Sequence, residues 1–313
     1  MASAISVHGL RRTYGEVVAV DSLDLEVADG EVYGFLGPNG AGKSTAVRML
    51  CTLASMTSGT ASVAGYDVAT QGDRVRLSIG VALQEAALDG KLTGRETLIL
   101  QGRYYGLERK SIAARIEELA PLLEMDAIDR RVSTYSGGMK RRLDLAAALM
   151  HNPRVLFLDE PTTGLDPISR ATVWEQIRRL NRELGMTIFL TTQYLEEADV
   201  LTHRVGILNR GRLVAEGTPD DLKRTVGSDV VVVRVVGNPE VAAGAIGQVP
   251  GIDNVEIYEN EVSAATGDGA SVISPVAVAL AAAGVEVSDL SIHPTTLDDV
   301  FLELTGARIE VEE

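Results

Sequence analysis

The chain has 313 residues, of which 45% are apolar and 23% are charged. This is the composition of an ordinary globular protein, long enough for one large and one small domain. It contains 29 Lys and Arg but 44 Asp and Glu, which gives a net charge of −15. An acidic surface is repelled by phosphate backbones and by anionic lipid heads. The charge therefore argues against nucleic acid as a partner and against direct insertion into lipid.

The single cysteine and the hydropathy of the sequence bear on the compartment of the chain and on its relation to membranes. Its one cysteine, Cys51, cannot form an internal disulfide, which indicates a reducing compartment. The N-terminal residues lack a basic region followed by an apolar stretch, so we expect no signal peptide. The longest weakly polar run, residues 272–285, is interrupted by Pro275 and is shorter than the roughly 20 apolar residues of a spanning helix. A membrane process would therefore need a second, membrane-spanning chain.

The N-terminal part predicts strands followed by a glycine-rich loop. Three short strands are expected at residues 5–7, 17–20 and 23–27, with polar breaks between them. An apolar run at residues 31–36 then leads into the sequence GPNGAGKST, after which helical spacing begins at residue 46. This order predicts a strand, a glycine loop and a helix.

Helices and strands alternate in the middle of the chain. Residues 92–125 have apolar positions at intervals of three and four, which predicts helices. Residues 155–180 again read as strand, loop and helix, and residues 187–191 predict another strand. Strands that alternate with helices favour a largely parallel sheet with ligands at the carboxyl ends of its strands.

The pattern changes near residue 225, where a second domain is expected. Its predicted order is β-α-β-β-α-β, which is typical of a ferredoxin-like α+β fold. The expected strands are 229–236, 254–258, 261–265 and 286–292, and the expected helices are 239–247, 275–283 and, at the end, 295–304. We therefore assign residues 1–226 to the large domain and residues 227–313 to an accessory domain.

The glycine loop matches the pattern G-x-x-x-x-G-K-[ST] of a phosphate-binding loop. Glycines let backbone N–H groups converge on phosphate oxygens, and the helix N-terminus adds partial positive charge. Lys43 is expected to reach the β- and γ-phosphates, and the Ser44 hydroxyl is expected to bind Mg²⁺. The predicted cradle comprises Gly37, Pro38, Asn39, Gly40, Ala41, Gly42, Lys43, Ser44 and Thr45.

Two carboxylates end the apolar strand at residues 155–158. Asp159 and Glu160 would be costly at the exit of a buried strand unless they bind something. Beside a phosphate cradle, Asp159 is expected to hold Mg²⁺ through its hydration shell. Glu160 is expected to polarise the attacking water, as a general base or as an orienting acceptor.

A serine and two glycines open the helix that precedes this strand, in the sequence Tyr135-Ser136-Gly137-Gly138-Met139. A hydroxyl is favoured at a helix N-cap, and such a helix start is a second anion site. These five residues resemble the LSGGQ signature of the nucleotide-binding domains of ABC transporters.

Further positions extend this resemblance over about residues 3–225. Gln84 lies at the Q-loop position, Asp166 ends the D-loop, and Tyr14 lies where the family stacks an aromatic ring on adenine. The resemblance implies that Gln84 takes part in Mg²⁺ binding and catalysis and that Asp166 contributes to the nucleotide site. It also implies a P-loop ATPase fold with a mixed sheet, an antiparallel β lobe and a helical subdomain at about residues 90–150.

The resemblance further implies how the chain works. In the family, the signature reaches the γ-phosphate bound by the opposite subunit, so that two copies form a head-to-tail homodimer around two Mg-ATP. One chain cannot easily fold its own signature onto its own cradle, since the helical segment lies between them. Hydrolysis opens the dimer, and this motion drives a membrane permease, with Gln84 and the helical segment as the relay.

Three positions depart from the family pattern. Tyr135 replaces Leu and Met139 replaces Gln, both at the edges of the signature. Gln193 replaces the usual switch histidine. A glutamine can still donate a hydrogen bond to a γ-phosphate, but it cannot carry a proton. We therefore expect Gln193 to sense the γ-phosphate and turnover to be slow if histidine chemistry is obligatory.

Three segments resemble the ATP-binding subunits of daunorubicin/doxorubicin-resistance exporters: TTQYLEEAD, LDLAAALMHNP and PTTLDDVFLELTG. That resemblance implies an ATPase subunit for efflux of a drug-like or hydrophobic molecule, bound to the cytoplasmic side of the membrane through a separately encoded permease. A soluble ABC ATPase acting on ribosomes or DNA is the alternative, and the acidic charge disfavours it.

Other polar residues have simpler interpretations. The basic run Lys140, Arg141 and Arg142 is expected to be a solvated helix face, or else to add positive field at a dimer interface. The four histidines lack metal-ligand spacing. The last predicted helix is amphipathic and packs either within its own domain or against a partner.

Overall fold

The computed structural model describes residues 3–83, 88–227 and 229–305. The chain divides into two compact units, the first ending at Pro219 and the second beginning at Asp220. This division places nearly all of helix α8 (Pro219–Val226) in the second unit. Within these described residues, no helix is both long and apolar enough to cross a membrane.

A six-stranded sheet with the order β10-β9-β3-β8-β7-β6 forms the centre of the first unit. All neighbours in it are parallel apart from the antiparallel pair of β9 and β10, so the predicted, largely parallel sheet is confirmed. Its middle strands are buried throughout, as expected for a sheet covered on both faces. The strands are β3 (Val32–Leu36), β6 (Ile79–Ala82), β7 (Val155–Asp159), β8 (Thr187–Thr192), β9 (Arg204–Asn209) and β10 (Arg212–Gly217).

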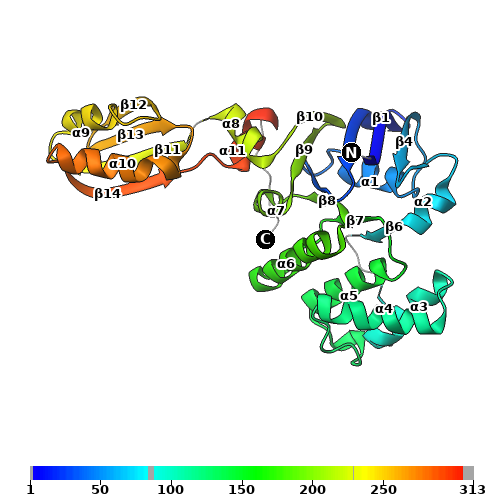
Figure 1. Cartoon of the computed structure of the whole chain (residues 1–313). Coiled ribbons are helices and arrows are strands. Elements are labelled where there is room, and N and C mark those ends of the chain that lie inside the picture. The colour runs from blue at the N-terminus through cyan, green and yellow to red at the C-terminus, as the bar shows by residue number, and fades with distance from the viewer. Residues whose placement is uncertain (1–2, 84–87, 228, 306–313) are drawn as a thin grey trace. The chain divides into compact units, whose positions relative to one another are not determined.

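An antiparallel lobe of order β2-β1-β4-β5 covers one side of this sheet (Figure 1). The prediction of three short strands is wrong, because β1 and β2 are two strands of 12 residues each. The polar break is an irregularity inside β2, where Ser22 adopts a φ of +54° and the pairing with β1 shifts. The lobe consists of β1 (Ser3–Tyr14), β2 (Val17–Ala28), β4 (Ser58–Val63) and β5 (Tyr66–Asp67).

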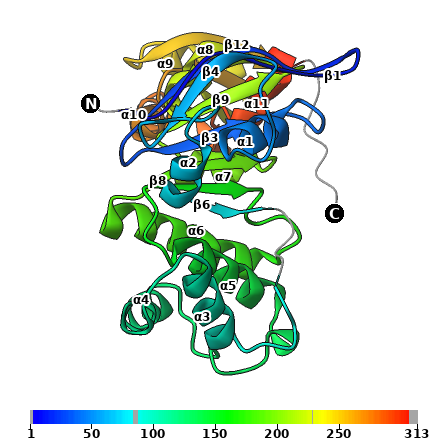
Figure 2. The same ribbon diagram turned by 90° about the vertical axis from the view of Figure 1, so that its right-hand side faces the viewer.

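Helices complete the first unit, and three of them form a separate group. Helices α3, α4 and α5 gather at the end of the unit away from the β lobe, in both views (Figures 1 and 2). They share an apolar core with α6 and with one face of β7 and β8, while the opposite face of those strands packs toward α1 and the lobe. The helices are α1 (Lys43–Leu50), α2 (Gly72–Ser78), α3 (Gly94–Tyr104), α4 (Arg109–Leu122), α5 (Gly137–Leu149), α6 (Pro167–Leu184) and α7 (Leu195–Leu201).

The second unit contains a four-stranded antiparallel sheet of order β12-β13-β11-β14. Helices α9 and α10 share one apolar core with it, so the ferredoxin-like prediction is confirmed. Helix α10 starts six residues before the predicted position, at Gly269 after the N-cap Asp268, and contains Pro275. The elements are β11 (Asp229–Val236), α9 (Pro239–Ile246), β12 (Ile252–Tyr258), β13 (Glu261–Thr266), α10 (Gly269–Ala282), β14 (Glu286–His293) and α11 (Leu297–Thr305).

Helix α11 is amphipathic, as the sequence predicts. Leu297, Val300 and Phe301 on its apolar side are buried. As far as the described residues extend, these side chains are not part of the core that α9 and α10 form with the sheet. Helix α11 belongs to the second unit, so the simpler of the two expectations, packing within its own domain, is not contradicted and stays a prediction.

Candidate nucleotide site

The predicted cradle connects β3 to α1 through two turns that only glycine adopts easily. Gly40 has a φ of +79° and Gly42 a φ of +108°. A Cβ at Gly42 would also collide with the carbonyl oxygen of Ala19, and one at Gly37 with that of Leu208. The surrounding strands thus enforce the glycines. The other cradle positions, Pro38, Asn39, Ala41, Ser44 and Thr45, lie in this loop or in the first turn of α1.

Lys43 is the first residue of α1, and its side chain is turned back into the loop. The residue is only 5% exposed. Its Nζ donates hydrogen bonds to the carbonyl oxygens of Gly37 at 2.5 Å and Pro38 at 3.3 Å. Burial lowers the pKa of Lys43, while the charges of Glu160 and Asp159 raise it. Because Lys43 opens α1, its ammonium group lies near a helix N-terminus, where an anion is favoured.

Two consecutive carboxylates, the last residue of β7 and the residue after it, lie two strands away from the cradle strand. Asp159 is 6% exposed, and its Oδ1 accepts a hydrogen bond of 2.5 Å from the hydroxyl of Thr191 on β8. The backbone N–H of Glu160 donates to the Thr191 carbonyl at 3.1 Å. Glu160 has a φ of +50°, a conformation that costs about 1–3 kcal/mol in a non-glycine residue and is concentrated at functional sites.

Gln193 follows β8, the strand between the cradle strand and the carboxylate strand. Since carboxyl ends of neighbouring parallel strands meet at one edge, Gln193 lies between the two groups along this edge. It is 7% exposed. The structure thus brings the cradle, both carboxylates and the predicted γ-phosphate sensor to one edge of the sheet.

Gln84 and Tyr14 are two further positions that the family resemblance assigns to the site. Gln84, predicted to bind Mg²⁺, is outside the described residues, and Leu83 precedes it after β6. Tyr14 ends β1 with 47% of its surface exposed. The guanidinium carbon of Arg12 lies 4.5 Å from the centre of its ring, so one ring face already has a cation partner.

The signature forms a capped helix start, packed against the D-loop. Ser136 is the N-cap of α5, and its hydroxyl accepts from the backbone N–H of Met139 at 3.3 Å. A Cβ on Gly138 would lie 3.0 Å from the hydroxyl oxygen of Ser169, and that hydroxyl donates to Asp166 at 2.6 Å. Asp166 also caps α6. Ser169 therefore links the signature to the D-loop, although it was not among the predicted site residues. Its position three residues after the helix cap Asp166 is the sequence feature that could have indicated this contact.

A single chain does not bring the signature to the cradle. Gly137 opens α5 among the grouped helices, whereas Lys43 opens α1 beneath the β lobe. In both views the two helices lie in different parts of the first unit (Figures 1 and 2). The two predicted anion sites are thus separate within one copy.

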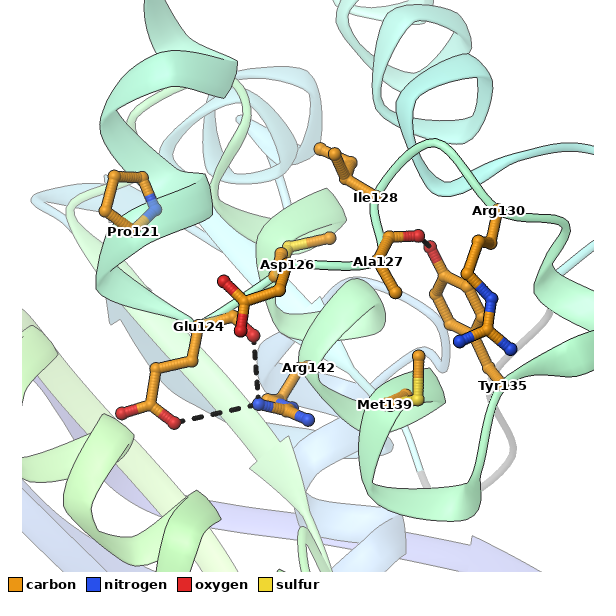
Figure 3. A pocket seen from close by; sticks show the side chains of 10 residues that line it. Pro121, Glu124, Asp126, Ala127, Ile128, Arg130, Tyr135, Met139 and Arg142 are labelled. Carbon is orange, nitrogen blue, oxygen red and sulfur yellow. Dashed lines mark hydrogen bonds and ion pairs between the residues drawn. The ribbon is translucent and has the colours of Figure 1, made fainter.

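A cavity of about 540 Å³ lies beside the signature (Figure 3). Tyr135 is 8% exposed and donates its hydroxyl to the carbonyl of Ala127 at 2.8 Å. A tyrosine can therefore replace the family's leucine without leaving a buried polar group unsatisfied. On the far side, Arg142 donates to the carbonyl of Glu124 at 3.0 Å.

The expectation that the basic run is a solvated face is wrong for one residue. Arg141 is 7% exposed and points into the protein rather than to solvent. A helix presents neighbouring residues about 100° apart, so one of three consecutive arginine and lysine side chains falls on the packed side. Within the described residues no group of three or more potential metal ligands occurs.

The geometry defines a class of protein. A glycine loop at a helix start, two carboxylates on a nearby strand of the same sheet and a Ser-Gly-Gly helix start on a separate helical group together make an ATP-binding cassette.

Comparisons with known proteins identify the family. The ABC transporter family model matches residues 20–163, and the C-terminal domain model of DrrA1-3-like ATP-binding proteins matches residues 217–305. The daunorubicin resistance ATP-binding protein DrrA2 of Streptomyces coeruleorubidus is 47% identical over 99% of this chain and 97% of its own length. The daunorubicin/doxorubicin resistance ATP-binding protein DrrA of Streptomyces peucetius is 44% identical, covering 97% and 92%.

The fold is similar to the solved structure of CbiO1 from Clostridium perfringens, which is part of an ABC transporter complex. The TM-score is 0.66, the sequence identity is 25%, and the match covers 72% of this chain and 95% of CbiO1. The chain therefore belongs to the ATP-binding proteins of ABC transporters, in the group of the daunorubicin/doxorubicin-resistance proteins. It is an ATP-binding and ATP-hydrolysing subunit.

Proposed function

We propose that ATP binds in the cradle together with Mg²⁺ and is hydrolysed at the carboxylate edge of the sheet. The observation that carries this proposal is the convergence of Lys43, Asp159, Glu160 and Gln193 on strand ends of one sheet. Oxygen donors are what Mg²⁺ prefers, and Ser44 and Asp159 offer a hydroxyl and a carboxylate that Thr191 orients. The bound metal would neutralise charge on the β- and γ-phosphates.

Each predicted residue has one proposed role. Lys43 and the backbone N–H groups of the loop hold the phosphates, and Tyr14 stacks on the adenine. Glu160 polarises the attacking water, as a general base or as an orienting acceptor. Gln193 donates to the γ-phosphate, and Gln84 completes the magnesium shell.

The second proposed element is a homodimer around two nucleotides. The Ser136–Gly138 helix start and the cradle lie apart within one copy, yet both are anion sites. A two-fold arrangement places the helix start of each copy on the nucleotide of the other. Ser136, Gly137, Gly138 and Asp166 then belong to the site of the partner.

We propose that the dimer powers efflux of a drug-like or hydrophobic molecule through a separately encoded permease, at the cytoplasmic side of the membrane. The support is similarity over nearly the whole chain to proteins named for daunorubicin and doxorubicin resistance. The alternative, an ABC ATPase acting on ribosomes or DNA, is disfavoured by the net charge of −15.

Co-purification tests the export proposal. The tagged chain is expressed with the membrane protein encoded beside it, and phosphate release is measured in detergent with and without hydrophobic cationic drugs. We expect a stable complex whose turnover rises with one of the drugs, while a Glu160→Gln complex stays inactive in every condition. Recovery of the chain with ribosomes, and without the membrane protein, would support the alternative.

Replacing Gln193 by histidine tests the γ-phosphate sensor. We expect kcat to rise by about tenfold, which is about 1.4 kcal/mol of barrier, because an imidazole both donates to the phosphate and exchanges a proton. Gln193→Ala should lower kcat by at least about tenfold, since a hydrogen bond to a charged group contributes about 1.5–3 kcal/mol. The measurement is steady-state phosphate release at saturating Mg-ATP. Equal turnover in all three proteins would remove Gln193 from the site.

A further inference from the structure

Arg141, one turn into the signature helix, is the buried exception in the basic run. Only 8% of its side chain is exposed. Its Nε donates to the carbonyl of Pro161 at 2.9 Å, and its Nη1 donates to the carbonyl of Leu83 at 2.8 Å and to the carboxylate of Asp144 at 3.0 Å. Longer contacts of 3.5 Å reach the carbonyls of Ala82 and Asp159.

These acceptors belong to three different parts of the nucleotide site. Pro161 follows the catalytic carboxylate Glu160, Leu83 follows β6, and Asp144 lies one turn further along the signature helix itself. The bond to Pro161 joins residues 20 positions apart, and the bond to Leu83 joins residues 58 positions apart. One guanidinium group therefore joins α5 to the exits of β6 and β7.

We propose that Arg141 is a positioning residue that sets the signature helix against the turn of Glu160. A shift of α5 would then change the position of Ser136 and the position of the catalytic carboxylate together. The inference rests on the proposed function, because it gives Ser136 a role at the nucleotide of the partner copy. It assigns to Arg141 no contact with ATP or water.

The chemistry of arginine suits this role. Its planar fork presents five donors in fixed directions, whereas a lysine ammonium is a single point charge on a flexible stem. The Asp144 carboxylate supplies the counter-charge. Burial raises the pKa of Asp144 more than the Arg141 charge and hydrogen bond lower it, which leaves the pKa at about 6. A buried ion pair by itself adds little net stability, so stabilisation by the pair with Asp144 does not explain why Arg141 is buried here. The hydrogen bonds to backbone carbonyls after β6 and after β7 do explain it.

Arg115 provides a matched control on the same helical group. It is a similarly buried arginine, with 10% of its side chain exposed, and it pairs with Glu118. It also donates to a backbone carbonyl of the α5 segment, that of Leu149, at 3.1 and 3.0 Å. These bonds anchor the far end of α5 and make no connection to β6 or β7. Arg115→Lys should therefore affect the melting temperature without a specific effect on turnover.

The test compares three variants: Arg141→Lys, Arg115→Lys, and Arg141→Met combined with Asp144→Leu. The double variant replaces the buried pair by apolar side chains of similar volume, a change that often preserves stability. Four quantities are measured for each: melting temperature, affinity for a fluorescent ATP analogue, kcat, and ATP-dependent dimerisation in the Glu160→Gln background.

We expect Arg141→Lys and the double variant to keep the nucleotide affinity within about twofold and to lose at least about tenfold in kcat, equivalent to about 1.4 kcal/mol. Both should need more ATP to dimerise. The double variant should melt near the temperature of the unchanged protein, so its low kcat would not be a folding defect. Arg115→Lys should keep kcat.

Three results would overturn the inference. If the double variant recovers both melting temperature and kcat, Arg141 only supports the fold. In the second result, the Glu160→Gln protein dimerises with ATP, the Arg141 variants made in that background dimerise equally well, and the same variants with Glu160 intact have full turnover. The inference then fails while the proposed function stands. A Glu160→Gln protein that never dimerises would remove both.

Discussion

Glu160→Gln should abolish ATP turnover, leave ATP binding intact and trap a dimer. Glutamine has the size of glutamate and can keep the contact with the Thr163 hydroxyl, which lies 3.3 Å from the carboxylate. It cannot accept a proton from water, and a general base contributes roughly 10²–10⁴-fold to a rate. We therefore expect kcat to fall by at least about a hundredfold. Phosphate release and size-exclusion chromatography with and without Mg-ATP are the measurements.

Glu196→Gln is the control for this experiment. Glu196 is an exposed carboxylate on α7, a few residues beyond the same sheet edge. Its replacement makes the same change of net charge without touching the strand exits, so the variant should turn over and should not accumulate as a dimer. The dimer model would be contradicted if Glu160→Gln eluted as a monomer at saturating Mg-ATP while still binding the nucleotide.

Lys43→Ala should weaken nucleotide binding more than any other single substitution in the loop. Lys43 is 5% exposed, and its ammonium group already lies inside the cradle, held by the carbonyls of Gly37 and Pro38. Hydrogen bonds to charged groups contribute about 1.5–3 kcal/mol, so we expect the Kd for ATP to rise by roughly ten- to a hundredfold. Titration calorimetry or a fluorescent analogue measures it directly.

Lys110→Ala is the matched control, because this exposed lysine on α4 lies on the helical group rather than at the cradle. It should bind ATP normally. Since Lys43 also holds loop carbonyls, the melting temperatures of both variants are compared, and Lys43→Arg restores the charge without the original geometry. An unchanged affinity in a folded Lys43→Ala protein would contradict the assigned cradle.

The sequence by itself determined the structure of those elements that are built from consecutive residues. A phosphate cradle needs closely spaced backbone N–H groups and a helix start, so the pattern around Lys43 carries nearly all of its own geometry. The same holds for Ser136 as an N-cap and for the strand at residues 229–236, whose bounds the structure reproduces as β11. Amphipathic alternation and capping are local, and local rules could be applied to the sequence directly.

Elements without a strong local pattern were missed. The short strands β4, β5, β6, β9 and β10 and the short helices α2, α7 and α8 were not predicted. Several of these elements have few residues. The strands among them also depend on pairing with strands that are far away in the chain. The long β2 was predicted as two strands, 17–20 and 23–27, because a bulge inside a ladder and a break between strands look alike in sequence. Only residues 5–7 of the long β1 were predicted as strand.

Only the tertiary structure decided which polar residues work together. Arg141 resembles its neighbours Lys140 and Arg142 in sequence, and a side chain carries its donors but not the identity of its acceptors. Those acceptors are backbone carbonyls, which have no sequence signal and which came from Leu83 and Pro161 on separate strand exits. The sequence therefore determined the chemistry available at this nucleotide site, and the folded chain decided how its parts are held against one another.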